Sequence, residues 1–265
     1  METLRLDELA RRQLGLTAEE ATGLIMAGRI YIGHVPADKP GMAVAADTVL
    51  TLKEKARRYA SRSGYKLEKA LQVFGVDPAG LTACDIGASN GGFTDCLLQH
   101  GAHHVYAVDV AYGILAWELR NSDKVTVLER QNARHLTEEH LGQKCDLVTA
   151  DVSFISLDKI FPAVDRVLKE NGRCVTLIKP QFEAPRGALG KNGTLKDPAM
   201  LPDILRHLCE AAASVGLYLQ DMTVSPIHGT NGNVEYLARF DRAPVTAPAD
   251  WETPIAQAIA AQPDE

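Results

Sequence analysis

The chain has 265 residues, with 28 lysines and arginines against 34 aspartates and glutamates, and a net charge of −6. Hydrophobic residues make up 46% and charged residues 23%, which is typical of a globular protein and excludes an intrinsically disordered one. No apolar run approaches the roughly 18–20 residues of a membrane-spanning helix, and the charged start lacks the apolar core of a signal peptide. We therefore expect a cytoplasmic protein. The acidic total argues mildly against a nucleic-acid partner, but residues 1–69 carry 12 basic and 9 acidic side chains, whereas residues 70–265 carry 16 and 25.

The first fifty residues predict a small appended domain. Periodic apolar residues predict helices over residues 4–15 and 18–27, and Thr17 with Glu20 forms a capping-box pattern at the second helix. Short strands are expected at residues 29–32 and 48–52. We place this domain at residues 1–54, followed by a basic interdomain linker at residues 55–63.

After Pro78 the pattern changes to strands that alternate with helices. The predicted strands cover residues 83–86, 104–108, 124–128, 146–150 and 173–178. Strand–helix alternation of this kind predicts an α/β fold, with a parallel sheet that is covered by helices on both faces. Two last strands, at residues 218–224 and 234–240, have no helix between them and predict an antiparallel hairpin at the sheet edge. We place this domain at residues 64–243 and expect residues 244–265 to form a flexible tail that carries at most one weak helix.

Five cysteines are scattered along the chain, and none of them forms a CxxC pair. They are Cys84, Cys96, Cys145, Cys174 and Cys209. This pattern predicts buried thiols in a reducing compartment, and neither a disulfide framework nor a metal site.

A glycine-rich segment follows the first strand of the predicted sheet. Its candidate cofactor contacts are Asp85, Gly87, Ala88, Ser89, Gly91, Gly92 and Phe93. Glycine permits a positive φ and the close approach of a ligand, and open α/β sheets bind ligands at the carboxyl ends of their strands. The G-x-x-x-G-G spacing differs from the dinucleotide fingerprint and lacks the lysine of a phosphate-binding loop. A tight turn without a ligand is an equally good explanation of this segment taken alone.

Residues at the ends of the next two strands indicate which class of ligand this site would bind. Asp109 ends the second strand, where an acidic residue can bind the two hydroxyls of a ribose. Asn132 and Ala133 follow the third strand and are placed to lie along an adenine edge. Each of these residues also has an ordinary structural explanation, such as a helix N-cap. Because these residues and the glycine-rich segment follow three successive strands, together they indicate a ligand that contains a nucleoside but no triphosphate. S-adenosylmethionine is such a ligand.

Four ionisable residues lie at the ends of predicted elements. They are Lys66 in the helix before the sheet, Asp151 after the fourth strand, Lys179 after the fifth, and Glu235 entering the last. The carboxyl ends of the first, fourth and fifth strands are neighbours in a doubly wound sheet, so Asp151 and Lys179 should lie close together beside the cofactor. Lys179 follows an apolar run, and burial of its stem favours the neutral amine that can act as a general base. Two structural ion pairs are the alternative explanation.

The chain resembles, over about residues 3–242, the TlyA family of rRNA 2′-O-methyltransferases, which are relatives of the FtsJ-like RNA methyltransferases. Seven stretches, which occur in order, make this resemblance specific. They read SRSGYKL, DIGASNGGFTD, VDVAYGILAW, NAR, ADVSFISL, LIKPQFE and SPIHGTNGNVEYL. The resemblance implies a Rossmann-like class I methyltransferase fold, with a mostly parallel seven-stranded sheet and an antiparallel edge strand. It also implies an N-terminal α+β domain with the RNA-binding fold named after ribosomal protein S-four. The family's catalytic set corresponds to Lys66, Asp151, Lys179 and Glu235.

The same resemblance implies a reaction and a partner. The reaction is methylation of the ribose 2′-hydroxyl of cytidine in ribosomal RNA by S-adenosylmethionine, without a metal, with Lys179 as the general base. Asp-Val-Ser-Phe at residues 151–154 stands in place of the Asp/Asn-Pro-Pro-Tyr signature of amino methylation, which favours oxygen as the acceptor. Ribosomal subunits are then the expected partner. The candidate phosphate contacts are Arg11, Arg12, Arg29, Lys53, Lys55, Arg57, Arg58 and Arg62.

Two other functions compete with this one. A pore-forming haemolysin, a name often given to this family, would need a membrane-active segment, and the best candidate, residues 211–219, is short. A non-catalytic RNA-binding module would bind ribosomal RNA without turnover. The complete set of four ionisable residues argues against this second alternative.

Overall fold

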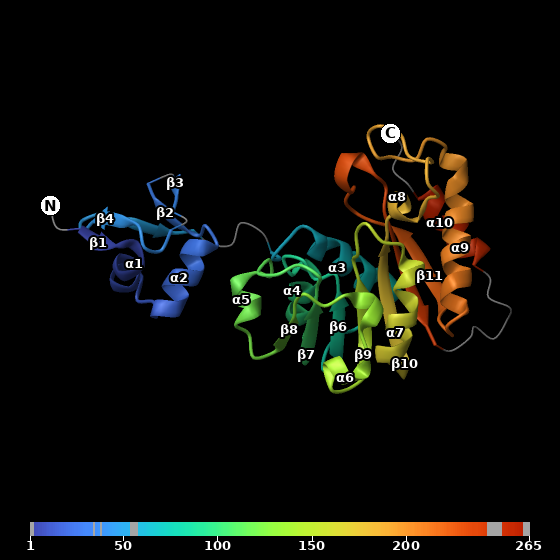
Figure 1. Cartoon of the computed structure of the whole chain (residues 1–265), viewed down its shortest axis with the longest axis horizontal. Helices are drawn as coiled ribbons and strands as arrows, with labels where there is room; N and C mark the ends of the chain where they lie inside the picture. Colours follow the sequence, from blue (N-terminus) through green and yellow to red (C-terminus); the bar gives the residue numbers. More distant parts are fainter. Residues whose placement is uncertain (1–2, 34, 38, 54–57, 243–250, 262–265) are drawn as a thin grey trace. The chain divides into compact units, whose positions relative to one another are not determined.

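The computed structural model describes residues 3–33, 35–37, 39–53, 58–242 and 251–261 of the chain (Figure 1). Contacts divide the chain into two compact units, which we describe separately. The first comprises Met1–Arg58 and Ala116–Ser122, and the second comprises Tyr59–Leu115 and Asp123–Glu265. The predicted linker spans this division, and its residues 55–57 lie outside the described part of the chain.

The first unit combines two helices with short antiparallel strands. Its elements are β1 (Thr3–Arg5), α1 (Leu6–Leu14), α2 (Ala18–Met26), β2 (Ile30–Ile32), β3 (Val35–Pro36), β4 (Ala43–Ala45), β5 (Leu50–Leu52) and α5 (Trp117–Arg120). β1 pairs with β4, and β2 lies between β3 and β5. Leu6, Leu9 and Ile25 are buried in its core. The predicted capping box is confirmed, because the Thr17 hydroxyl accepts the Glu20 N–H (3.2 Å) and the Glu20 carboxylate accepts the Thr17 N–H (2.7 Å).

The second unit is built on a seven-stranded sheet. Its strands are β6 (Thr82–Ile86), β7 (His104–Val108), β8 (Val125–Leu128), β9 (Cys145–Ala150), β10 (Leu168–Ile178), β11 (Tyr218–Val224) and β12 (Tyr236–Asp241). Its helices are α3 (Ser63–Phe74), α4 (Gly92–Gln99), α6 (Glu138–Leu141), α7 (Phe161–Val167), α8 (Pro180–Glu183), α9 (Leu201–Ala213), α10 (Glu252–Ala260) and the 3₁₀ turns η1 (Ala133–His135), η2 (Leu157–Lys159), η3 (Pro198–Met200) and η4 (Thr230–Gly232).

The strand order is β11-β12-β10-β9-β6-β7-β8, and the mostly parallel doubly wound sheet is confirmed (Figure 1). Strands β6 to β10 run parallel, so their carboxyl ends form one edge. β12 runs antiparallel to both β10 and the edge strand β11. The predicted hairpin is therefore present, and it is β12, second from the edge, that runs against its neighbours. Because Tyr236 pairs with Ile178, the start of β12 lies at the same edge as the end of β10.

Helices cover both faces of this sheet, which explains why nearly every residue of its central strands β6, β7 and β9 is buried. On one face, α3 and α4 pack over Ala83, Leu147 and Val175. On the other face, α7 and α9 belong to a second core with the alternate strand residues, including Ile86 and Val148. The five cysteines are buried free thiols, as predicted. No helix of the described residues is long and apolar enough to cross a membrane.

The end of the chain differs from the predicted flexible tail. Residues Glu252–Ala260 form α10, which packs on β11 and α9. The reason is spacing, because Ile255 and Ala258, three residues apart on one helix face, are 2% and 1% exposed. Glu252 also forms an ion pair with Arg206 (2.6 Å).

Candidate active site

Lys179 and Asp151 meet at the carboxyl edge of the sheet. Asp151 follows β9 and Lys179 follows β10, and because these strands are hydrogen-bonded neighbours the two side chains form an ion pair of 2.6 Å. The Lys179 ammonium also donates a hydrogen bond to the Ser153 hydroxyl (2.9 Å). Both charged side chains are largely shielded, with 11% of Lys179 and 16% of Asp151 exposed. The structure thus brings together two of the four predicted residues.

Lys66 and Glu235 form a second and more deeply buried ion pair. Lys66 lies in the first turn of α3, and Glu235 immediately precedes β12. Their Nζ and Oε2 atoms are 2.5 Å apart, and the residues are only 5% and 3% exposed. The turn at Gly229 closes around the glutamate, since a Cβ at that position would lie 2.2 Å from Oε1 of Glu235.

Three of these four residues line one cavity of about 250 Å³: Lys66, Asp151 and Lys179. Glu235 lies behind Lys66 and contributes through its ion pair. Phe93 and Ala88, both predicted cofactor contacts, line the same cavity. A lysine–aspartate pair beside a second lysine gives this cavity a mixed, mainly cationic wall.

A second cavity, of about 280 Å³, extends over the ends of β7 and β8. The predicted residues Asp109, Asn132 and Ala133 line it, together with an apolar wall that the sequence analysis did not identify. That wall includes Val108, Val110, Ile114, Val152, Ile155 and Ile160. The two cavities share Gly87, Ser89, Asp151 and Ser153, so they meet at the glycine loop. One elongated ligand can therefore extend from the apolar cavity to the charged one.

The glycine loop is held close to the end of β9. Gly87 has φ 83°, and a Cβ there would lie 2.4 Å from the backbone oxygen of Asp151, so only glycine fits. The Ser89 N–H and the Ala111 N–H each donate to the Asp109 carboxylate, both at 2.8 Å. These bonds fix the orientation of the Asp109 carboxylate at the wall of the second cavity.

Asp85, Gly91 and Gly92 were predicted to contact the cofactor, and the structure differs here because none of them lines either cavity. Asp85 is fully buried, and its two oxygens accept hydrogen bonds from the hydroxyls of Thr94 (2.6 Å) and Thr149 (2.9 Å). Gly91 is the N-cap residue that precedes α4, and it has φ 91°. Gly92 is packed so tightly that a Cβ would lie 2.0 Å from a serine hydroxyl oxygen. All three residues therefore support the glycine loop from the side that faces away from the two cavities.

Asp85 gives a testable pH dependence of stability. Burial raises the pKa of Asp85 to about 6. The hydrogen bonds from Thr94 and Thr149 lower this pKa, whereas the charge of Asp151 raises it. The native state therefore binds the Asp85 proton more tightly than the unfolded state, so the free energy of unfolding falls as pH rises from about 4 to 6, by about 3 kcal/mol. Urea unfolding across this range should show a shallower fall for Asp85→Asn. Equal pH slopes in the wild type and the variant would contradict this assignment.

An aromatic pair lies at this edge, and of its two members only Phe182, as part of a candidate lid over the substrate, could be singled out from the sequence. Phe154, which lines the second cavity, is 92% exposed and has φ 63°, a left-handed conformation that is uncommon for a bulky residue. Its ring centroid lies 5.0 Å from that of Phe182 in α8. The Lys179 ammonium lies 5.9 Å from the Phe182 centroid. No periodicity marks these residues, since Phe154 lies in an irregular segment and α8 is only four residues long.

The predicted phosphate contacts fall into three groups. Arg11, Arg12, Arg29 and Lys53 lie in the first unit, Arg58 and Arg62 lie at and just after the division, and Lys55 and Arg57 lie outside the described residues. Within the first unit, Arg12 is paired with Glu8, and the Lys53 ammonium lies 3.8 Å from the Tyr31 ring centroid. Arg62 lines the charged cavity of the second unit.

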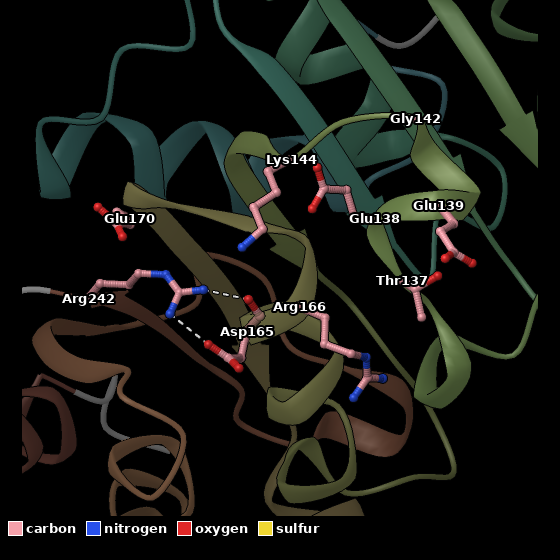
Figure 2. Close-up of a pocket in the computed structure, with 9 residues that line it drawn as sticks. All are labelled: Thr137, Glu138, Glu139, Gly142, Lys144, Asp165, Arg166, Glu170 and Arg242. Atoms are coloured by element: carbon pink, nitrogen blue, oxygen red, sulfur yellow. Dashed lines mark hydrogen bonds and ion pairs between the residues drawn. The ribbon is translucent and has the colours of Figure 1, made fainter.

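A further cavity, of about 810 Å³, lies at the opposite edge of the sheet (Figure 2). Lys144 precedes the start of β9 there, and Arg242 follows the end of the antiparallel β12. Figure 2 shows Arg242 paired with Asp165, at 2.6 Å. None of the predicted site residues lines this cavity. Among the residues that the structure describes, no cluster of histidine, cysteine, aspartate and glutamate could hold a metal ion.

Comparison with known proteins identifies the second unit. A model for FtsJ-like methyltransferases matches residues 59–242. The chain belongs to the FtsJ-like methyltransferase family. It is 44% identical to the 16S/23S rRNA (cytidine-2′-O)-methyltransferase TlyA of Mycobacterium tuberculosis over 86% of both chains. It is 38% identical to Hemolysin A of Brachyspira hyodysenteriae, over 89% of this chain and 99% of that one.

A solved structure from Streptococcus thermophilus, provisionally named a hemolysin, has the same architecture. It is 40% identical, with a TM-score of 0.73, and the match covers 98% of this chain and 95% of that chain. The family match covers the whole sheet and every member of the Lys–Asp–Lys–Glu set. The chain is thus a methyltransferase that shares extensive similarity with proteins bearing hemolysin names.

Proposed function

We propose that the protein transfers a methyl group from S-adenosylmethionine to the ribose 2′-hydroxyl of cytidine in ribosomal RNA, acting on ribosomal subunits in the cytoplasm. The observation that carries this proposal is the meeting of two cavities at Gly87, Ser89, Asp151 and Ser153. One cavity has the chemistry of a nucleoside site, and the other is lined by Lys66, Asp151 and Lys179. The substrate is suggested by the 44% identical TlyA relative.

The apolar cavity fits the cofactor. Asp109 has its carboxylate fixed by two backbone N–H groups and is placed to accept hydrogen bonds from ribose hydroxyls. Asn132 and the apolar side chains opposite it suit the edge and faces of an adenine ring. Gly87 allows the glycine loop to pack directly against the backbone of Asp151, where the two cavities meet. When bound, S-adenosylmethionine supplies a sulfonium-activated methyl group.

Lys179 is suited to remove the proton of the attacking hydroxyl. Asp151 and Ser153 fix its Nζ at the junction of the cavities, and Lys179 must release its own proton before it can act as a base. Neutral Lys179 would take the hydroxyl proton, and the 2′-oxygen would accept the methyl group that bound S-adenosylmethionine would supply, with the demethylated thioether as the leaving group. Holding the two reactants in near-attack geometry contributes up to about 7–11 kcal/mol.

The acceptor nucleoside has a matching surface. The exposed Phe154 ring contacts the partly buried Phe182 ring, which lies near Lys179, and offers an apolar face on which an unstacked base can rest. A base held there would leave its ribose near Ser153 and Lys179. Asp151-Val152-Ser153-Phe154 lacks the prolines and tyrosine of amino methyltransferases, in agreement with a hydroxyl acceptor.

Direct transfer of the methyl group tests this proposal. Purified protein, tritiated S-adenosylmethionine and ribosomal subunits from cells that lack the protein should give labelled RNA, with the label at a cytidine ribose after nuclease digestion. Label on a base, on protein, or on no product would refute the proposal. Isothermal titration calorimetry with S-adenosylmethionine in the absence of RNA tests the cofactor assignment independently.

Basic residues of the first unit should bind RNA without affecting the cofactor. Arg11 and Lys53 are exposed, and each phosphate contact that is lost should reduce the salt dependence of RNA affinity by about one in log–log slope. We expect Arg11→Gln/Lys53→Gln to bind ribosomal RNA more weakly, with unchanged affinity for S-adenosylmethionine. Filter binding at several salt concentrations measures the slope.

The matched control for this prediction is Lys144→Gln, which removes a lysine from the opposite edge of the sheet (Figure 2). This variant should bind RNA like the wild type. An equal loss of RNA affinity in both proteins would show that binding responds to total charge and not to the first unit.

A further inference from the structure

The structure joins residues 153–157 to residues 179–183 at three points. Two of them involve the proposed base, Lys179, and the aromatic pair Phe154–Phe182 described above. The third is Glu183, the last residue of α8, whose carboxylate accepts hydrogen bonds from the Ser156 hydroxyl and from the Leu157 N–H (3.1 Å). Glu183 takes no part in the chemistry proposed above, yet it is one of the connections between the two segments that border the acceptor side.

The turn that Glu183 holds contains the strained Phe154. A phenylalanine at φ 63° keeps this conformation only where the surrounding structure imposes it. On one side of Phe154, Ser153 is fixed by the base, and on the other side Ser156 is fixed by Glu183. The aromatic side chain is therefore presented to solvent by a turn that is fastened at both ends to residues 179–183.

The hydrogen bonds of Glu183 stabilise a carboxyl group that is largely removed from water. Burial raises its pKa to about 7, with a smaller contribution in the same direction from Asp158, whereas the bonds from Ser156 and Leu157 lower it. A carboxyl group that is kept out of water in this way depends on its two donors. Conversely, without the carboxylate the Leu157 N–H and the Ser156 hydroxyl would lose their acceptor.

We propose that Glu183 is a positioning residue for methyl transfer, which holds the Ser153–Ser156 turn so that the acceptor ribose meets Lys179. This inference depends on the proposed function. Its direct consequence is a separation of kinetic parameters. Turnover should fall much more than cofactor affinity, because the Asp109 carboxylate is held by the Ser89 and Ala111 N–H groups without Glu183, although Phe154 and Ile155 of the held turn also line the cofactor cavity.

The test compares Glu183→Ala, Glu183→Gln and Ser156→Ala in the full-length protein, with tritium transfer to ribosomal subunits as the readout. Because small misplacements of reactants are costly, we expect kcat to fall by about tenfold to a hundredfold in Glu183→Ala. Glutamine keeps an acceptor for Leu157 and should restore most of the rate. Ser156→Ala removes one of the two bonds and should show a smaller fall in kcat. The dissociation constant of S-adenosylmethionine should stay within about threefold in all three proteins.

Asp146→Ala is the matched control. Asp146 also accepts a backbone N–H, from Thr82 (3.0 Å), and a side-chain bond, from Lys169 (2.7 Å), but it lies near the start of β9, at the far edge of the sheet. Its loss should lower the unfolding temperature without lowering kcat. An equal fall in kcat in Asp146→Ala and Glu183→Ala would reduce the role of Glu183 to general stability and overturn the inference.

Two outcomes separate this inference from the proposed function. If the wild type methylates RNA and Lys179→Met does not, while Glu183→Ala and Ser156→Ala turn over normally, the positioning role is wrong and the proposed function stands. If the wild type transfers no methyl group to RNA, the proposed function itself fails. Should Glu183→Ala not fold, a low kcat in folded Ser156→Ala supports the inference, and a normal kcat overturns it.

Discussion

Lys179→Met should lower the rate of methyl transfer by about a hundredfold to ten-thousandfold while leaving the protein folded and able to bind S-adenosylmethionine. Methionine keeps the length and the apolar stem of the side chain but has no amine to accept the hydroxyl proton. The measurement is single-turnover tritium transfer at saturating cofactor and RNA, with calorimetry to follow cofactor binding. Loss of cofactor affinity parallel to the loss of rate would show that Lys179 serves binding and not proton transfer.

Two further variants make this experiment specific. Lys179→Arg retains the positive charge and a partner for Asp151, but guanidinium does not give up its proton in proteins. A general base predicts that this variant is as inactive as Lys179→Met, whereas a purely electrostatic role predicts substantial activity. Lys169→Met is the matched control, since Lys169 forms an ion pair of 2.7 Å with Asp146, near the start of β9. Its methylation rate should equal that of the wild type.

Glu235→Leu should be strongly destabilising, by about 3–5 kcal/mol in the free energy of unfolding. The substitution leaves the Lys66 ammonium, which is 5% exposed, without its partner at 2.5 Å. Removing both charges in Lys66→Met/Glu235→Leu should restore most of the lost stability, because replacing a buried ion pair by apolar side chains is often close to neutral. Urea unfolding measures both effects.

The double variant also distinguishes a structural pair from a catalytic one. Lys66 lines the charged cavity, so we expect the double variant to be stable and yet deficient in methyl transfer. A stable double variant with the wild-type rate would mean that Lys66 and Glu235 only support the fold. A double variant as unstable as Glu235→Leu would contradict the explanation by an unpaired buried charge.

The fold could be predicted where the signal is local. Strand–helix alternation after Pro78 and the capping box at Thr17 follow from residues close together in the chain, and both are present in the structure. A weak helix in the tail could be predicted, but its docking could not, because the burial of Ile255 requires β11 and α9, which precede it by many residues. A short apolar stripe by itself does not show whether another surface will cover it.

The site residues could likewise be predicted only where their positions depend on local sequence patterns. Asp151 and Lys179 could be placed together because each directly follows a strand of a doubly wound sheet. Asp85 was predicted to contact the cofactor, but its carboxylate accepts hydrogen bonds from Thr94 and Thr149. Strand alternation does not reveal these two partners. Phe154 gave no signal, because its exposure and its positive φ exist only in the folded turn.

The sequence by itself determined the class of fold, the glycine loop and the four ionisable residues at element ends, because these depend on short-range periodicity and on residue type. Only the tertiary structure decided which of those residues meet. Lys66 and Glu235 are 169 positions apart, and they pair because β12 inserts antiparallel beside β10 and brings its first residue to the carboxyl edge. Strand order depends on long-range pairing, which local patterns do not encode. The two cavities likewise meet only in the assembled sheet, at Asp151 and Ser153, which are also the partners of Lys179.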